Sequence, residues 1–244
     1  MSKQVTLLMC SPRAEQSASY SLGTYIASLL EEKGFSSKIF QIYKTLRNTN
    51  KIDEMIKAID ESDILLLSSP LYIDSAPCMT IKLMNIITQK TQEEKISKKE
   101  RFLFAISNAG YLEYYHNNIA LKIYEQFANK NEFTWAGGLP IGGAGMYAST
   151  TISHFLKQFD ALPEEDPRHE YFAKPARILD AVIKTSVDYM SKGKTVPKKE
   201  LQKLEFIPMP LQAYAEGGNK NWMKWAEQLG TKDKLRDKPY EVKG

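Results

Sequence analysis

Hydroxyl and guanidinium side chains crowd the segment that follows the first apolar run of the chain. Ser11 and Arg13 come directly after residues 5–9, and Ser17 and Ser19 precede a stretch with helical periodicity. A helix start with positive charge and small hydroxyls favours a phosphate group, because backbone N–H groups and charge-assisted donors converge there. Taken singly, Ser17 or Ser19 could equally be a helix cap. Together, the four side chains predict a phosphate site.

A second segment predicts a rigid loop whose apolar and aromatic side chains could pack against a flat ligand. Pro70 and Pro77 restrict a loop that follows another apolar run, and between them stand Leu71, Tyr72 and Ile73. A planar aromatic ligand needs an apolar or aromatic side chain to stack on and backbone amides for its polar edge. The alternative is an ordinary turn in which Tyr72 covers the core.

A third segment, after residues 102–106, allows the backbone to come close to a ligand. Asn108 and Gly110 permit a tight turn, and Tyr111 could form the rim of a cavity. His116 could donate a proton or contact a substrate, although a single histidine beside aromatic residues can also be structural. We therefore assign no catalytic residue.

A glycine-rich stretch, residues 143–148, fits the pattern GxGxxA of dinucleotide-binding loops. Its position is wrong for that role, because the fingerprint belongs after the first strand of the fold. A glycine-rich loop beside the ligand is the other interpretation, and both stay open.

Metal chemistry has little support in the composition. Cys10 and Cys78 form no CxxC pair and the three histidines are scattered, so neither an iron–sulfur cluster nor a zinc site is expected. Two unpaired cysteines, with no signal peptide and no long apolar run, predict a cytoplasmic protein without a membrane partner.

The charge of the chain is modest, at 33 − 29 = +4. The basic cluster of Lys98, Lys99 and Arg101 is interpreted as a solvated loop, because it forms no stripe and is not interleaved with aromatic residues. No nucleic-acid partner is expected.

These segments need elements to position them. Over the first two-thirds of the chain, near-continuous apolar runs alternate with helical periodicity, as in sheets covered by helices on both faces. The predicted strands are residues 5–9, 37–43, 64–67, 102–106 and 133–138. This alternation predicts an α/β fold with a doubly wound, five-stranded parallel sheet. The phosphate-type loop after the first strand favours the order 2-1-3-4-5, in which the ligand binds at the carboxyl ends of the strands.

The character of the chain changes after residue 192. A short amphipathic helix further on carries Trp222, Trp225, Ala226 and Leu229 on one face. Two tryptophans on one short helix are not expected to remain in water. We predict one domain over residues 1–192 and a C-terminal helical extension over residues 193–244 that packs on the domain or on a partner subunit.

Over residues 3–190, three motifs resemble the flavodoxin-like NAD(P)H-dependent FMN reductase superfamily. They are Ser11-Pro12-Arg13 with Ser17 and Ser19, Ser69-Pro70-Leu71-Tyr72, and Ser107-Asn108-Ala109-Gly110-Tyr111. The resemblance implies a flavodoxin-like fold and bound FMN. It assigns the FMN phosphate to Ser11, Arg13, Ser17, Ser19 and Tyr20, and the flavin ring to Pro70, Leu71, Tyr72 and Ile73 on one side and Asn108, Gly110 and Tyr111 on the other.

The leading functional hypothesis is an FMN-dependent oxidoreductase. It would take electrons from NADH or NADPH and pass them to a small acceptor such as a quinone, a nitro compound or an azo compound. One alternative is a flavodoxin-type electron carrier, and another is an interaction protein that keeps the fold without the cofactor. The resemblance also implies a homodimer or homotetramer.

Overall fold

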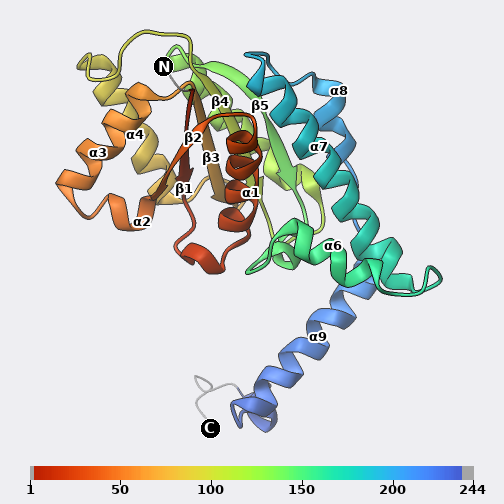
Figure 1. The fold of residues 1–244 in the computed structure, drawn as a ribbon. Helices are drawn as coiled ribbons and strands as arrows, with labels where there is room; N and C mark the ends of the chain where they lie inside the picture. The colour runs from red at the N-terminus through yellow and green to blue at the C-terminus, as the bar shows by residue number, and fades with distance from the viewer. Residues whose placement is uncertain (1–2, 238–244) are drawn as a thin grey trace, which may run out of the picture. The chain divides into compact units, whose positions relative to one another are not determined.

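The computed structural model describes residues 3–237. The strands are β1 (Gln4–Met9), β2 (Ser36–Gln41), β3 (Ile64–Pro70), β4 (Phe102–Asn108) and β5 (Thr134–Ile141). The longer helices are α1 (Ala18–Glu32), α3 (Thr49–Glu61), α4 (Cys78–Gln92), α5 (Asn118–Lys130), α6 (Ile152–Asp160), α7 (Lys174–Ser191) and α9 (Leu211–Gln228). Short helical turns, α2 (Ile42–Thr45) and α8 (Lys198–Leu201), accompany them (Figure 1).

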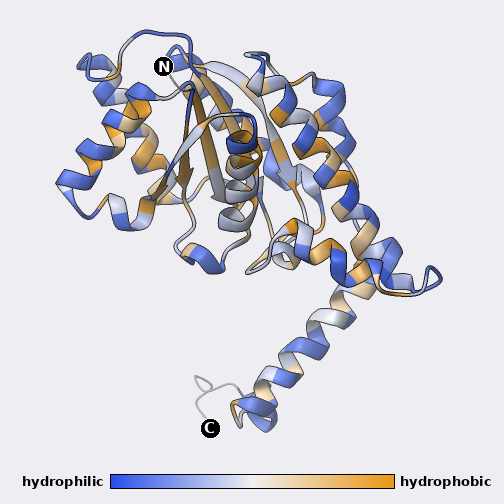
Figure 2. Ribbon diagram, viewed as in Figure 1, coloured by the Kyte–Doolittle hydropathy of each residue, from blue (hydrophilic) through white to orange (hydrophobic). Residues whose placement is uncertain are grey.

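The sheet is parallel throughout and has the predicted order, β2-β1-β3-β4-β5. Strands β1, β3 and β4 are buried along almost their whole length, which explains their near-continuous apolar sequences. Strand β2 stands at an edge and is more exposed. Figure 2 shows the resulting concentration of hydrophobic residues in the central strands.

Helices cover both faces of the sheet (Figure 1). Alternate residues of a strand point to opposite faces, so Leu7 and Leu66 pack under α1, α6 and α7, whereas Leu8 and Leu67 pack under α3, α4 and α5. The doubly wound α/β architecture predicted from the sequence is therefore confirmed, and the fold is flavodoxin-like.

Helix α1 lies close to the sheet because of a glycine. A Cβ atom at Gly23 would lie 2.9 Å from Leu7 Cδ1 and 3.2 Å from Ser68 Cβ. At the start of the helix, the Ser68 hydroxyl donates to the carbonyl oxygen of Ser19 (2.7 Å). These contacts fix the N-terminus of α1 against the carboxyl ends of β1 and β3, where ligands bind in such sheets.

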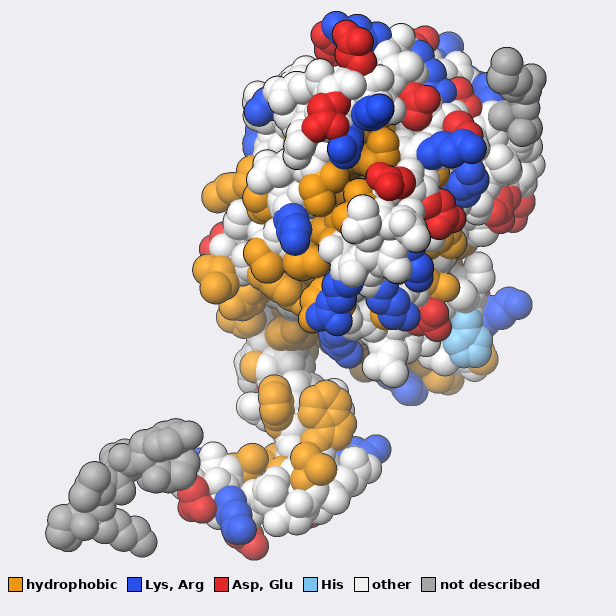
Figure 3. All heavy atoms as spheres, turned by 90° about the vertical axis from the view of Figure 1, so that its left-hand side faces the viewer, with side chains coloured by type: hydrophobic (Ala, Val, Ile, Leu, Met, Phe, Trp, Pro, Cys, Tyr) orange, Lys and Arg blue, Asp and Glu red, His pale blue; other side chains and the backbone are white. Residues whose placement is uncertain are grey.

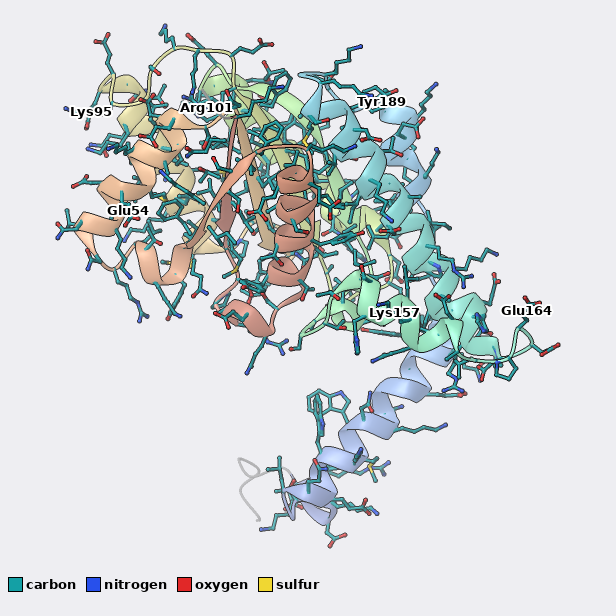
Figure 4. The ribbon with its side chains drawn as sticks, in the orientation of Figure 1. Glu54, Lys95, Arg101, Lys157, Glu164 and Tyr189 are labelled. Atoms are coloured by element: carbon teal, nitrogen blue, oxygen red, sulfur yellow. The ribbon has the colours of Figure 1, made fainter. Side chains whose placement is uncertain are left out.

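The basic cluster at the opposite end of the sheet differs from the sequence interpretation. Arg101 is fully buried rather than solvated. Its guanidinium donates to the carbonyl oxygens of Ser62 (3.2 Å) and Asp60 (2.9 Å), and its Nη2 lies 3.6 Å from Asp60 Oδ1. Figure 4 shows Arg101 near the amino ends of the strands, so its role is to join loops at the end of the sheet away from the predicted ligand site.

The chain divides into two compact units after Pro208, later than the predicted boundary at residue 192. Residues 193–208 belong to the first unit, because Val196 N–H donates to Ala136 O of β5 (2.9 Å) and Leu204 is buried in its core. In the second unit, α9 is longer than the sequence predicted and is followed by a turn in which Thr231 N–H donates to Ala226 O (2.8 Å).

Candidate cofactor-binding site

Three loops meet in a cavity of about 170 Å³ at the carboxyl ends of the strands. They follow β1, β3 and β4, the positions at which the sequence predicted a ligand. Leu71 N–H donates to Asn108 O (2.8 Å), which joins the second loop to the third. The predicted residues that line the cavity are Ser11, Arg13, Ser17, Ser19, Pro70, Leu71, Tyr72, Asn108 and Gly110.

Asn108 joins all three loops. Its Nδ2 donates to Ser19 Oγ (2.9 Å) and to Ser69 O (2.9 Å), and the side chain is buried. Both amide hydrogens are therefore used within the protein, and only the side-chain carbonyl oxygen could meet a ligand. Asn108 acts first as a brace that sets the distance between the loops.

Ser17 caps α1, as the simpler sequence interpretation allowed. Its Oγ accepts from Tyr20 N–H (3.1 Å) and donates to Ala14 O (2.6 Å). The hydroxyl hydrogen is therefore committed to the loop and is not available to an anion. Ser17 contributes to the cavity by holding the helix start in place.

Ser11, Ser19 and Arg13 keep donors for an anion. Ser11 Oγ accepts from Arg13 N–H (3.3 Å), and Ser19 Oγ accepts from Asn108. Within residues 3–237, the two hydroxyl hydrogens and the exposed guanidinium of Arg13 have no hydrogen-bond acceptor or ion-pair partner. The first turn of α1 adds backbone N–H groups that the helix cannot bond and the positive end of its dipole. This donor set suits a phosphate dianion.

The loop after β5 forms a fourth wall of the cavity. Ala144 N–H donates to Ala109 O (2.8 Å) and Gly143 N–H donates to Tyr111 O (2.6 Å), so the loop is bound to the one after β4. Ala144, Gly145 and Ala148 face the cavity. The glycine-rich stretch is therefore a loop beside the candidate ligand site. This agrees with the second of the two sequence interpretations of residues 143–148, a glycine-rich loop beside the ligand.

Three predicted residues do not line this cavity. Tyr20 instead borders a neighbouring hollow of about 450 Å³ together with Thr24, Thr151 and His154. Ile73 is 99% exposed at the tip of its loop, and Tyr111 is 64% exposed. The last two stand at the mouth of the site rather than inside it.

An aromatic cluster forms part of this mouth. The ring of His116 lies 5.3 Å from that of Tyr111 and 5.0 Å from that of Tyr115, centroid to centroid. His116 Nδ1 lies 3.1 Å from Asp74 Oδ1. Because Asp74 comes from the loop after β3, this contact joins the mouth across two loops and fixes the orientation of the imidazole.

The tip of the loop after β3 is strained. Ile73 and Asp74 have φ angles of 50° and 54°, which are unusual for any side chain and rare for a β-branched one. Tyr72 N–H donates to Ser75 O (3.0 Å) and Ser75 N–H to Tyr72 O (3.2 Å), so the turn is closed tightly. It presents an apolar side chain to solvent beside the cavity.

The two cysteines have different environments. Burial raises the pKa of the Cys10 thiol to about 12, and the residue packs in the core. Cys78 is exposed at the start of α4. Among residues 3–237, no group of three or more histidine, cysteine or acidic side chains is placed to hold a metal ion, and no helix is long and apolar enough to cross a membrane.

A larger groove, of about 650 Å³, runs along β5 beside Trp135, Leu201 and Gln202. It lies away from the loops that follow β1, β3 and β4, and neither a serine nor an arginine lines it. The smaller cavity is therefore the candidate site.

Comparisons with known proteins agree with the fold. No protein-family model matches the sequence, and no curated protein matches it. Among solved structures, the NADH:FMN oxidoreductase EmoB in its apo form is similar, with a TM-score of 0.50 and 12% identity over 87% of this chain and 98% of that one. The flavoenzyme FerB from Paracoccus denitrificans, an NAD(P)H:(acceptor) oxidoreductase, is similar with a TM-score of 0.50 and 13% identity over 79% and 98%. At these identities the similarity concerns the flavodoxin-like fold.

Proposed function

We propose that this protein binds FMN in the cavity at the carboxyl ends of β1, β3 and β4 and acts as an NAD(P)H-dependent oxidoreductase on a small acceptor. The observation that carries the proposal is the meeting of a phosphate-type donor set and an apolar, aromatic wall in one cavity. FMN has these two ends, a phosphate and a planar ring. The solved structures with the same fold that are described as FMN or NAD(P)H oxidoreductases support it.

Each wall of the cavity would hold one part of the cofactor. Ser11, Ser19, Arg13 and the first turn of α1 would bind the phosphate through charge-assisted hydrogen bonds. Leu71 and Tyr72 would pack against the ring, and the small residues after β4 and β5 would leave room for it. When bound, FMN supplies the redox chemistry, accepting electrons from NAD(P)H and delivering them to the acceptor.

The mouth of the site suits a flat, partly apolar acceptor. Tyr111 and Tyr115 present aromatic faces to solvent, and Ile73 adds an apolar tip. Quinones, nitro compounds and azo compounds take up protons together with electrons. His116, held at Nδ1 by Asp74, can exchange a proton with such an acceptor at Nε2. We propose a quinone, nitro or azo compound as the acceptor, a cytoplasmic location and a homo-oligomeric state.

The test is the visible spectrum of the purified protein, recorded with FMN and then with NADH or NADPH under anaerobic conditions. Loss of the bound-flavin bands on addition of either nucleotide supports the reductase. Bound flavin that ignores both nucleotides indicates an electron carrier, and absence of flavin binding contradicts the proposal.

A matched pair of double variants tests the placement of the phosphate. Ser11→Ala with Arg13→Ala removes a hydroxyl and a charge from the cavity and should abolish retention of FMN during gel filtration. Ser28→Ala with Arg47→Ala makes the same chemical change at exposed positions away from it, and should retain FMN as the wild type does. Equal retention by both double variants would refute the assignment of the site.

A further inference from the structure

Helix α9 carries a continuous stripe of apolar and small residues. They recur at alternating intervals of four and three positions, which keeps them on one side of an α-helix. The stripe consists of Leu211, Ala215, Gly218, Trp222, Trp225 and Leu229. The charged residues of the helix lie on the other side, namely Glu216, Lys220, Lys224 and Glu227.

The stripe is exposed. Trp222 is 64% and Trp225 is 55% accessible to solvent, and Leu211 and Leu229 are also exposed. The two tryptophan rings touch only edge to face, with centroids 5.7 Å apart. Figure 3 shows hydrophobic side chains gathered on this part of the chain. A stripe of this size, with two tryptophans, marks a surface for association.

Two adjacent glycines lie in the middle of α9 and pack against no other described residue of the second unit. Apart from its chain neighbours and the backbone of the helix itself, a Cβ atom at Gly217 or Gly218 would meet no heavy atom of the described residues within 4 Å, and neither residue has a positive φ. A glycine inside a helix costs about 1 kcal/mol relative to alanine. Gly218 lies on the stripe, where the absence of a side chain leaves room for a bulky group from elsewhere.

Large and small residues of the stripe are placed symmetrically about Lys220. Gly218 lies two residues before Lys220, and Trp222 lies two residues after it. In the same way Ala215 and Trp225 are each five residues from Lys220, and Leu211 and Leu229 are each nine residues from it. Each tryptophan thus has a small counterpart, and each terminal leucine has a leucine. Two identical helices that pack antiparallel, with their stripes facing and with residue 220 of each at the same height, would bring all of these counterparts face to face.

We propose that α9 associates with α9 of a second copy of this chain in an antiparallel pair, stripe against stripe, with the twofold axis at the height of residue 220 along the helix. Trp222 of each copy lies over Gly218 of the other, and Trp225 lies over Ala215. A parallel pair would instead place tryptophan against tryptophan and glycine against glycine. The antiparallel arrangement also sets the positive end of each helix dipole beside the negative end of the other, and it leaves the charged residues in solvent.

The interface of this helix pair is small. Four tryptophans at these exposures would bury about 500 Å² in total, and the leucines add to it, whereas a stable interface commonly needs about 1,200 Å² or more. We therefore expect association in the range of micromolar concentrations, which sedimentation can follow.

The test is sedimentation velocity of the full-length protein at concentrations from about 1 to about 200 µM. This range brackets the micromolar dissociation constant that we expect for the helix pair. Gly218→Leu places a bulky side chain under Trp222 of the second copy, and should weaken the association step at least about tenfold. Gly217→Leu is the matched control, because it makes the same change off the stripe, and should associate as the wild type does. Neither position packs against another described residue of the second unit, so the leucine should not disturb α9 itself.

A compensating double variant tests the register. Gly218→Trp alone should abolish the association step, and Trp222→Gly alone should weaken it. Combining the two places one tryptophan and one glycine in each pair again, so association should return. A wild-type chain without a concentration-dependent step, an unchanged step in Gly218→Leu, or a combined variant that fails to recover would each overturn the proposal.

Discussion

The side-chain amide of Asn108 and the hydroxyl of Ser19 are 89 residues apart in sequence and 2.9 Å apart in the structure. This hydrogen bond joins the carboxyl end of β4 to the first turn of α1. The same amide holds the carbonyl of Ser69 at the end of β3. Three of the four walls of the candidate site are therefore fixed relative to one another by one side chain.

Asn108→Asp tests this brace, because the carboxylate keeps the shape of the side chain but cannot donate its two hydrogen bonds. We expect the free energy of unfolding, measured by titration with urea, to fall by about 2 kcal/mol. The affinity for FMN, measured by titration with FMN, should fall at least about tenfold. Asn129→Asp, at an exposed position of α5, is the control and should change neither quantity appreciably. Undiminished FMN affinity in Asn108→Asp would show that the brace does not shape the site.

Ile73→Asn tests the strain in the loop after β3. Asparagine tolerates the left-handed conformation that Ile73 adopts at φ = 50°, and the side chain loses no burial because it is 99% exposed. We expect the free energy of unfolding in urea to rise by about 1 kcal/mol. Ile207→Asn is the control, because Ile207 has no positive φ and no strain to lose; since it is only 52% exposed, the substitution should lower the free energy of unfolding by about 1 kcal/mol through lost burial. Equal effects of the two substitutions would argue against stored strain.

Gly142→Ala tests how closely the loop after β5 approaches the one after β4. A Cβ atom at this position would lie 2.1 Å from Leu112 O, a backbone atom that cannot move away alone. We expect a loss of about 3 kcal/mol in unfolding free energy, measured by urea denaturation. Gly145→Ala, where a Cβ meets nothing within 4 Å, should have an effect of about 0.5 kcal/mol or less. A Gly142→Ala protein as stable as Gly145→Ala would contradict the close approach.

Asp60 makes stability depend on pH at the amino end of the sheet. Burial acts to raise the pKa of its carboxyl group, but hydrogen bonds from Ser97 and the charges of Arg101 and Lys99 outweigh it and leave the pKa below its usual value. A lowered folded-state pKa means that the stabilisation is complete above the unfolded-state pKa and is lost as the pH falls through the folded-state value.

We therefore expect the wild type to lose stability below about pH 4, and Asp60→Asn to be less stable at pH 7 but to lose less on acidification. The measurement is the unfolding free energy in urea between pH 7 and pH 3. Glu54→Gln, at an exposed position of α3 (Figure 4), should keep the pH dependence of the wild type. If the unfolding free energy of Asp60→Asn falls with pH as steeply as that of the wild type, Asp60 does not cause the acid dependence.

Periodicity was sufficient to predict the sheet and most of the helices. Strands covered on both faces are apolar along their length, and each helix must place an apolar stripe on the sheet. The order of the strands was inferred instead from the phosphate-type loop after β1. The length of α9 was underestimated because Gly217 and Gly218 interrupt its helical pattern. A guanidinium group can be buried only where hydrogen-bond acceptors surround it. For Arg101 these acceptors are the carbonyl oxygens of Ser62 and Asp60, which lie far away in sequence, so the burial of Arg101 could not be predicted from its own segment.

Part of the lining of the candidate cavity could be predicted from local chemistry. Ser11, Arg13 and Ser19 were recognisable because a strand end followed by a helix start concentrates donors at one place. The capping role of Ser17 was one of the two sequence interpretations, because the bond is local. The brace formed by Asn108 depends on hydrogen bonds to distant segments that no spacing reveals. The resemblance assigned Ile73 and Tyr111 to the flavin ring, but both are largely exposed outside the cavity, and for Tyr111 the sequence had already suggested a place at the rim.

The most direct test of the central claim is a fluorescence titration of the purified protein with FMN and, in parallel, with riboflavin, which differs from FMN only by lacking the phosphate. If Ser11, Ser19, Arg13 and the start of α1 bind that phosphate, FMN should bind at least about 100-fold more tightly than riboflavin, since two charge-assisted hydrogen bonds suffice for such a difference. Equal affinity for the two flavins, or binding of neither, would contradict the account.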